Sequence, residues 1–134
     1  MKQSIATAAA IFALSIGTTN GLGINCRGSS DCNFVGNFGH VIAEMRQLCG
    51  GDQNQQFSNG QHIITVNEQI TNFPVRRNFC AFTQNMGDRT IPKWKACQLL
   101  GFLADHGCNQ CGSVPVDFPN VNDVSKGQLT VNRC

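Results

Sequence analysis

Leu22-Gly-Ile-Asn-Cys-Arg-Gly-Ser-Ser-Asp-Cys32 is the stretch around which the rest of the chain is organised, because a second close pair of cysteines, Cys108 and Cys111, matches its own pair. If both pairs are disulfides, the start of the mature chain is tied twice to a point near residue 110. A disulfide that closes a loop of about 80 residues restricts the unfolded chain by roughly 4 kcal/mol in the chain-entropy model. Such a double clamp would organise a fold that does not rely on its core alone.

Residues 1–21 have the composition of a secretory signal peptide. Lys2 supplies a positive charge, the run Ile5–Ile16 is nearly all small or apolar, and Gly21 is a small residue at the proposed cleavage site. The apolar run is too short to span a bilayer. We therefore expect a secreted, extracellular protein that does not insert into membranes, with one mature domain over residues 22–134.

All 8 cysteines follow the proposed cleavage site. An even number of cysteines in an exported chain indicates disulfides. Zinc is disfavoured because export exposes the thiols to an oxidising compartment, and because the spacing of Cys26 and Cys32 is wide for a zinc knuckle. A redox-active pair at Cys108 and Cys111 is disfavoured because it follows a predicted helix, whereas redox motifs open one. We expect structural disulfides and neither metal nor cofactor.

The charge of the mature chain excludes two classes of partner. The whole chain has 10 basic and 8 acidic side chains, and removal of Lys2 leaves a net charge near +1. Neither nucleic acid nor an anionic membrane surface is strongly attracted by so small a charge. The mature length of about 113 residues fits one domain with one core, and we expect it to be a monomer.

Two segments have apolar residues three or four positions apart, which predicts amphipathic helices. The first runs from Asn37, a suitable N-cap, to Cys49, and the second from Pro92 to the stop at Gly107. The predicted buried positions are Phe38, Val41, Ile42, Met45, Leu48 and Cys49 in the first helix, and Trp94, Cys97, Leu100, Gly101, Leu103 and Ala104 in the second.

Four segments have the alternating or β-branched composition of strands. We expect a loop over Gly50–Gln61 and a turn or loop over Asn72–Arg77. The order of elements predicts an α+β fold, a single-domain α/β sandwich with two helices packed on one face of a small, mainly antiparallel sheet. The predicted strands are residues 22–26, 62–66, 78–83 and 128–131.

Three blocks of the chain resemble the killer protein four family of fungal killer toxins. The blocks are Leu22–Cys32, His106–Ser113 and Asn122–Asn132, in the family's order and with cysteines at equivalent places. The resemblance implies a single-domain α/β sandwich. It also implies four disulfides: Cys26–Cys108, Cys32–Cys111, Cys49–Cys97 and Cys80–Cys134.

The resemblance further implies a non-enzymatic activity against other cells. Toxins of this family are secreted, inhibit competing fungi or target cells, and act from outside by blocking voltage-gated calcium channels with a lysine. The equivalent segment here, Gln61–Thr65, contains neither lysine nor arginine. A positively charged side chain can block a cation pathway by occupying it or by repelling the cations. The candidate contacts with a cell-surface target are therefore the remaining clustered cations, Arg76, Arg77, Arg89, Lys93 and Lys95. The alternative is that these are ordinary solvated charges.

Two other functions fit the sequence less well. A small secreted hydrolase such as a ribonuclease would pair His40, His62 or His106 with Glu44 or Glu68. No histidine has a neighbour at helical spacing that builds an obvious acid–base or metal pair, so we expect no catalytic residue. A non-toxic secreted effector on the same scaffold is the second alternative.

The segment Asp117–Asp123 is rich in side-chain oxygens, which raises the question of calcium. It lacks the spacing and the glycine of a known calcium-binding loop. Asx turns are the simpler interpretation of Asp117, Asn120, Asn122 and Asp123, and we expect no metal there.

Overall fold

The computed structural model describes residues 22–35, 40–70 and 75–134. The proposed signal peptide and the predicted helix start at Asn37 lie outside the described residues. No described helix is long and apolar enough to cross a membrane. In chain order the elements are η1 (Ser30–Phe34), α2 (Val41–Gln47), β2 (Gln56–Phe57), β3 (Ile64–Ile70), β4 (Val75–Gln84), β5 (Ile91–Pro92), α3 (Lys93–Asp105), β6 (Gly112–Pro115), η2 (Val124–Lys126) and β7 (Gln128–Arg133).

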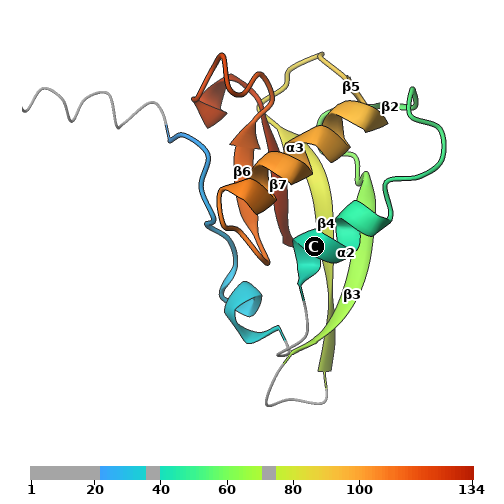
Figure 1. Cartoon of the computed structure of the whole chain (residues 1–134), viewed down its shortest axis with the longest axis vertical. Coiled ribbons are helices and arrows are strands. Elements are labelled where there is room, and N and C mark those ends of the chain that lie inside the picture. The colour runs from blue at the N-terminus through green and yellow to red at the C-terminus, as the bar shows by residue number, and fades with distance from the viewer. Residues whose placement is uncertain (1–21, 36–39, 71–74) are drawn as a thin grey trace, which may run out of the picture.

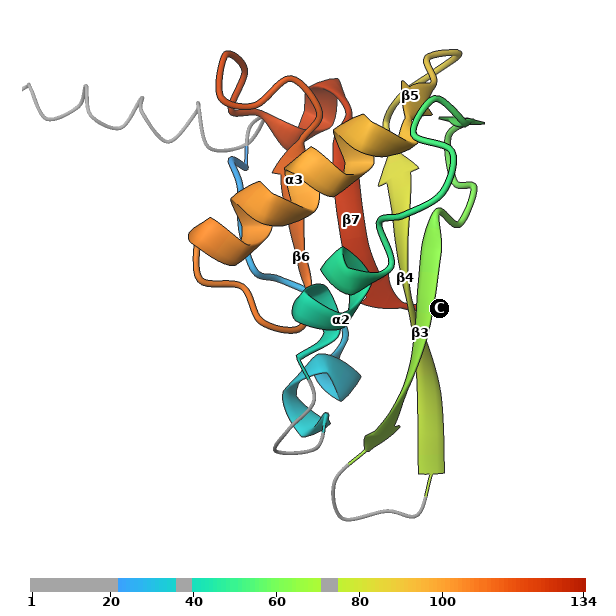
Figure 2. The same ribbon diagram turned by 45° about the vertical axis from the view of Figure 1, so that its right-hand side comes forward.

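The main sheet has four antiparallel strands in the order β3-β4-β7-β6. α2 and α3 lie on the same face of this sheet (Figures 1 and 2). In the register of the sheet, Val66 lies opposite Phe79 and Ala81 opposite Val131, and all four side chains are buried beneath the helices. The predicted α+β class, with two helices packed on a mainly antiparallel sheet, is confirmed.

The helices contribute the other half of the core. In α2, Val41, Ile42 and Met45 are buried, as predicted. In α3 the buried residues are Ala96, Leu99, Leu100 and Leu103.

Leu100 and Leu103 are buried as predicted, but the observed buried face of α3 also includes Ala96 and Leu99 and is therefore rotated from the predicted one. Trp94 is 49% exposed, and Leu48, at the end of α2, is 50% exposed. Trp94 and Cys97 share one stripe, whereas the buried stripe runs through Leu99 and Leu103. Leu48 points to solvent because it is the C-cap and no longer part of the helix.

The predicted strand over residues 22–26 is wrong. The segment forms a single bridge in which Asn25 and Ser113 exchange backbone hydrogen bonds of 2.9 and 2.8 Å. The Asn25 side chain donates to the Gly23 carbonyl and accepts from the Arg27 N–H. These local bonds compete with a longer ladder.

The predicted turn over Asn72–Arg77 is also wrong at its end, because β4 begins at Val75. Val75 pairs with Ile70, and Arg77 with Glu68. The apolar pair of Val75 and Ile70 stabilises the ladder, and the pairing extends the hairpin beyond the predicted strands. Residues 72–74 lie outside the described part of the chain.

Four disulfides join the elements, with the same pairing that the family resemblance implies. Two of them tie the stretch Leu22–Cys32 to the turn between α3 and β6, one joins the end of α2 to α3, and one joins β4 to the last residue. The pairs are Cys26–Cys108, Cys32–Cys111, Cys49–Cys97 and Cys80–Cys134.

Candidate functional site

The five predicted target-contact cations lie in two separate regions. Arg76 and Arg77 lie near the end of the β3–β4 hairpin, and Arg89, Lys93 and Lys95 lie in and before the start of α3, at the other end of the molecule (Figure 1). The structure therefore does not bring all five into one patch.

Arg76 and Arg77 point to opposite faces of the sheet, because successive side chains in a strand alternate. Arg76 is exposed on the face without helices, where its Nη2 donates to the Asn67 carbonyl at 2.8 Å and its Nε to the Asn67 side-chain oxygen. Arg77 lies on the helix-bearing face and is half-buried. Arg76 and Arg77 are adjacent in the sequence but therefore belong to two different surfaces.

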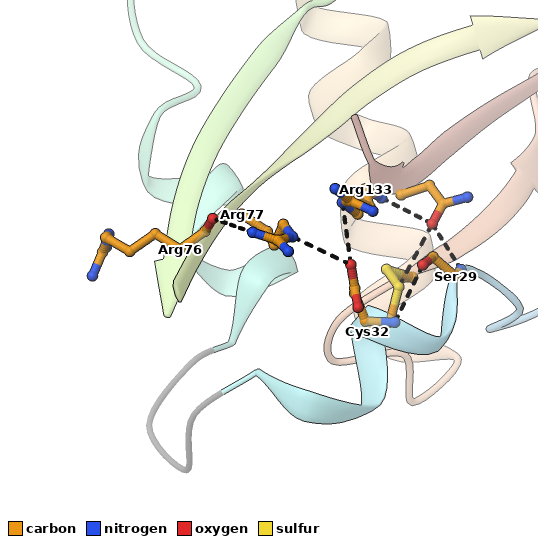
Figure 3. A network of polar contacts seen from close by, with 8 residues as sticks. Ser29, Cys32, Arg76, Arg77 and Arg133 are labelled. Carbon is orange, nitrogen blue, oxygen red and sulfur yellow. Dashed lines mark hydrogen bonds and ion pairs between the residues drawn. A yellow bond between two sulfur atoms is a disulfide. The ribbon is translucent and has the colours of Figure 1, made fainter. Parts of the chain in front are cut away.

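Arg77 belongs to a charge cluster built from three elements. Asp31 in η1 forms an ion pair with Arg133 of β7, with 3.1 Å between Nε and Oδ2, while the Arg77 Nε lies 3.8 Å from the same oxygen. In Figure 3 the guanidinium of Arg77 lies between the Arg76 carbonyl, to which its Nη1 donates at 3.1 Å, and η1, where Asp31 lies. Asn132 accepts from the Ser29 N–H at 2.9 Å and holds η1 against β7.

The cations at the start of α3 have mainly structural contacts. The Nη2 of Arg89 donates to both carboxylate oxygens of Asp117, at 3.0 and 3.2 Å. Lys93 donates to the Gly50 carbonyl at 2.7 Å, and Lys95 to Gln98 at 3.3 Å.

Trp94, which was predicted to be buried, is exposed at the start of α3 between these two lysines in the sequence. The sequence Lys93-Trp-Lys95 could have indicated that Trp94 is exposed, because both of its neighbours in the first turn of the helix are charged. Exposed tryptophans are enriched among residues that dominate binding interfaces.

The segment Gln61–Thr65, where the family's lysine would lie, instead presents His62. This side chain is exposed, its Nδ1 lies 3.5 Å from the Cys80 sulfur, and its ring packs 5.9 Å from that of Phe82. His62, Cys80 and Cys134 are close enough to hold a metal ion. Because the two sulfurs are bonded to each other, neither is available as a thiolate ligand.

The structure brings Glu44 of α2 and Glu68 of β3 together. Burial raises the pKa of Glu68 to about 7, a hydrogen bond and charge repulsion from Glu44 add to the rise, and Arg76 opposes it. His40 is the N-cap of α2 and His106 the C-cap of α3. No contact described here joins a histidine side chain to either glutamate.

Asp117, Asn122 and Asp123, three of the four residues considered for calcium, have protein partners in the described structure. Asp117 accepts from Arg89, Asn122 accepts from the Ile24 N–H at 2.9 Å, and Asp123 caps η2 by accepting from Ser125. The hydrogen bonds from Ser125 lower the pKa of Asp123. Only the contact of Asp123 with the Ser125 N–H is the local bond expected of an Asx turn, whereas Asp117 and Asn122 bind distant segments.

The fold and its cross-links define a class of small α+β proteins whose N-terminal stretch is clamped by paired disulfides. A model of the Kp4 family matches residues 7–134. The chain is 37% identical over 114 residues to the KP4 killer toxin of Ustilago maydis P4 virus, which covers 83% of this chain and 79% of that toxin. The chain therefore belongs to the Kp4 family and is a killer-toxin-like protein.

Proposed function

We propose that this protein is a secreted toxin that inhibits the growth of competing fungi or other target cells from outside the cell. Its 37% identity to a killer toxin over 83% of the chain is the observation that carries this proposal. The four disulfides support export, because such cross-links persist in oxidising compartments.

The proposed mode of action is binding to a cell-surface protein without catalysis, with a voltage-gated calcium channel as the target. Exposed cations suit the acidic mouth of a cation pathway. Because the segment Gln61–Thr65 contains no lysine or arginine, the contacts must come from other surfaces. Lys93, Trp94 and Lys95 offer charge and an aromatic anchor together, while Arg76 offers a single cation.

Recording of calcium currents from target cells tests this mode of action. Native protein should reduce the current, and protein with reduced and blocked cysteines should not, because the fold depends on its disulfides. Growth of a panel of fungi should fall in parallel. Unchanged currents and unchanged growth across the panel would refute the toxin proposal and favour a non-toxic effector on the same scaffold.

Charge variants locate the contact surface. The triple substitution Lys93→Gln, Trp94→Ala, Lys95→Gln should weaken growth inhibition at least about tenfold if this surface binds the target, whereas Arg76→Gln, at the other end of the molecule, is the matched comparison. Trp94 and Arg76 are exposed, whereas Lys93 and Lys95 are partly buried and Lys93 donates to the Gly50 carbonyl, so urea unfolding of each variant shows whether a loss of potency comes from a loss of stability. Equal potency of the triple variant and the native protein would remove the start of α3 from the interface.

A small secreted hydrolase is the second candidate, favoured by the Glu44–Glu68 pair with its raised pKa. Such an enzyme would need a histidine or one of these carboxyls as its acid or base. A variant with His40, His62 and His106 replaced by alanine, and Glu68 by glutamine, should keep full potency if the toxin acts by binding. Loss of potency in the folded variant would support catalysis.

A further inference from the structure

A cavity lies between η1 and the end of the β3–β4 hairpin, on the helix-bearing face of the sheet. Its volume is about 250 Å³, and three apolar side chains and one ion pair line it. The hairpin extends past α2 toward η1 (Figure 2), so this part of the sheet is not covered by the helix. The lining residues are Asp31, Phe34, Ile70, Val75 and Arg77.

Arg77 has an unmet hydrogen-bond donor beside this cavity. Its Nε is buried and has no acceptor among the described residues. Asp31 is too distant at 3.8 Å to accept a hydrogen bond and lies closer to Arg133. A buried donor without an acceptor is unfavourable, and an oxygen atom placed in the cavity would satisfy it.

The charge of the residues that line the cavity indicates which oxygen-bearing group of a ligand would bind there. Asp31 faces two guanidinium groups, those of Arg77 and Arg133, so the cluster is positive overall. A positive cluster with a free donor favours a carboxylate, because hydrogen bonds between ionised groups are the stronger ones. The apolar walls of Phe34, Ile70 and Val75 favour a neighbouring hydrocarbon group.

The volume of the cavity selects the size of the ligand. Pockets for drug-sized molecules enclose about 300–1,000 Å³, and this cavity of about 250 Å³ lies below that range. One or two side chains of a partner protein fit such a space. Phe34, which is 45% exposed, gives the opening an aromatic edge for the rest of the partner.

We propose that this cavity, the Arg77 cavity, binds an acidic side chain flanked by an aliphatic residue on the surface of the target protein. The proposal rests on the proposed function, because it supposes a protein as target. It assigns Arg77 the recognition of a carboxylate, a role separate from that of the cations at the start of α3.

Nuclear magnetic resonance titration of the full mature protein tests the proposal without a target cell. The probe is the blocked peptide acetyl-Leu-Glu-Leu-amide, and the matched probe is acetyl-Leu-Gln-Leu-amide. The glutamate peptide should shift the amide signals of Phe34, Ile70, Val75 and Arg77 and bind about tenfold more tightly than the glutamine peptide. Equal affinity of the two peptides, or no shift at these residues, would overturn the proposal.

Three variants make the test specific. Arg77→Gln should abolish the preference for the glutamate peptide. Arg77→Lys, which retains the charge but lacks the Nε donor, should weaken it. Arg76→Gln, on the opposite face of the same strand, should leave it intact. Loss of the preference only in Arg76→Gln would contradict the assignment, and the amide spectrum of each variant shows whether it is folded.

Hexanoate tests whether the cavity binds a small fatty acid and not a side chain of a protein. It carries a carboxylate and an aliphatic chain but no peptide, and it should bind more weakly than the glutamate peptide. Tighter binding of hexanoate would overturn the assignment to a protein partner. Peptide binding together with unchanged calcium currents would reject the proposed function and leave the cavity's chemistry standing.

Discussion

At the scale of single residues, Glu68 and Arg77 show how neighbours acquire different roles. They lie directly opposite each other in the β3–β4 ladder, a position at which opposite charges ordinarily pair. Arg77 instead lies near Asp31 of η1, and Glu68 shares a hydrogen bond with Glu44 of α2. Tertiary neighbours, and not the ladder, decide the chemistry of both side chains.

The raised pKa of Glu68 predicts a pH-dependent stability. Its pKa rises from 4.5 to about 7 in the folded protein, so between these pH values the native state holds a proton that the unfolded chain releases. The free energy of unfolding should therefore fall as the pH rises from about 4.5 to about 7, and then level off. Glu68→Gln should remove this part of the pH dependence, as measured by urea unfolding across this range.

Asp105→Asn is the matched control for that experiment, because Asp105 is an exposed carboxylate at the end of α3. Its pH dependence should equal that of the native protein. The same slope in the Glu68→Gln variant as in the native protein would show that another group causes the dependence.

At the scale of elements, the contact between the N-terminal stretch and β6 depends on a glycine. A Cβ built on Gly112 would lie 2.5 Å from the Asn25 carbonyl oxygen and 3.1 Å from a methyl carbon of Leu103. Real side chains do not approach backbone so closely. The clash predicts that Gly112→Ala pushes the N-terminal stretch away from β6.

Gly112→Ala should lower the free energy of unfolding by about 1–3 kcal/mol, the usual result of overpacking. Urea unfolding measures the change. Gly50→Ala is the matched control, because no atom lies within 4 Å of a Cβ built there, and its stability should be nearly unchanged. Equal effects of the two substitutions would mean that close contact with Asn25 does not matter.

The elements also show where sequence patterns are informative. Val41, Ile42 and Met45 were predicted to be buried because their period defines one face of a helix. In α3, small and apolar residues occur on two adjacent faces of the helix, so their spacing does not decide which face is buried. Packing against the sheet decided that the face with Leu99 is buried. β2 and β5 were missed because strands of two residues leave no period.

At the scale of the whole molecule, the double clamp should be strongly non-additive. With Cys26–Cys108 in place, Cys32–Cys111 closes a ring of only about nine residues, which is worth roughly 2.5 kcal/mol in the chain-entropy model. When both are absent and Cys49–Cys97 is in place, restoring either one closes a ring of about 35 residues, which is worth roughly 4 kcal/mol. Either one can therefore replace most of the other.

Replacing one clamp pair by alanine should cost roughly 2.5 kcal/mol, and replacing both pairs roughly 6.5 kcal/mol. Single-pair variants should stay folded and the double variant should be largely unfolded, because small domains have a stability of only about 5–15 kcal/mol. Circular dichroism with urea unfolding measures this. If the loss in the double variant is only the sum of the two single losses, the entropic account of the clamp is wrong.

The sequence by itself determined the fold class and, through the family's three blocks, the cysteine pairing and the killer-toxin relationship. These features depend on the local spacing of apolar residues and on the order and spacing of the cysteines, both of which can be read in the sequence alone. Only the tertiary structure decided that Arg76 and Arg77 face opposite sides, that Trp94 is exposed, and that Arg77 borders a cavity with η1. Each of these depends on which distant segment packs against a residue, and no local pattern in Leu22–Cys32 or elsewhere records that choice.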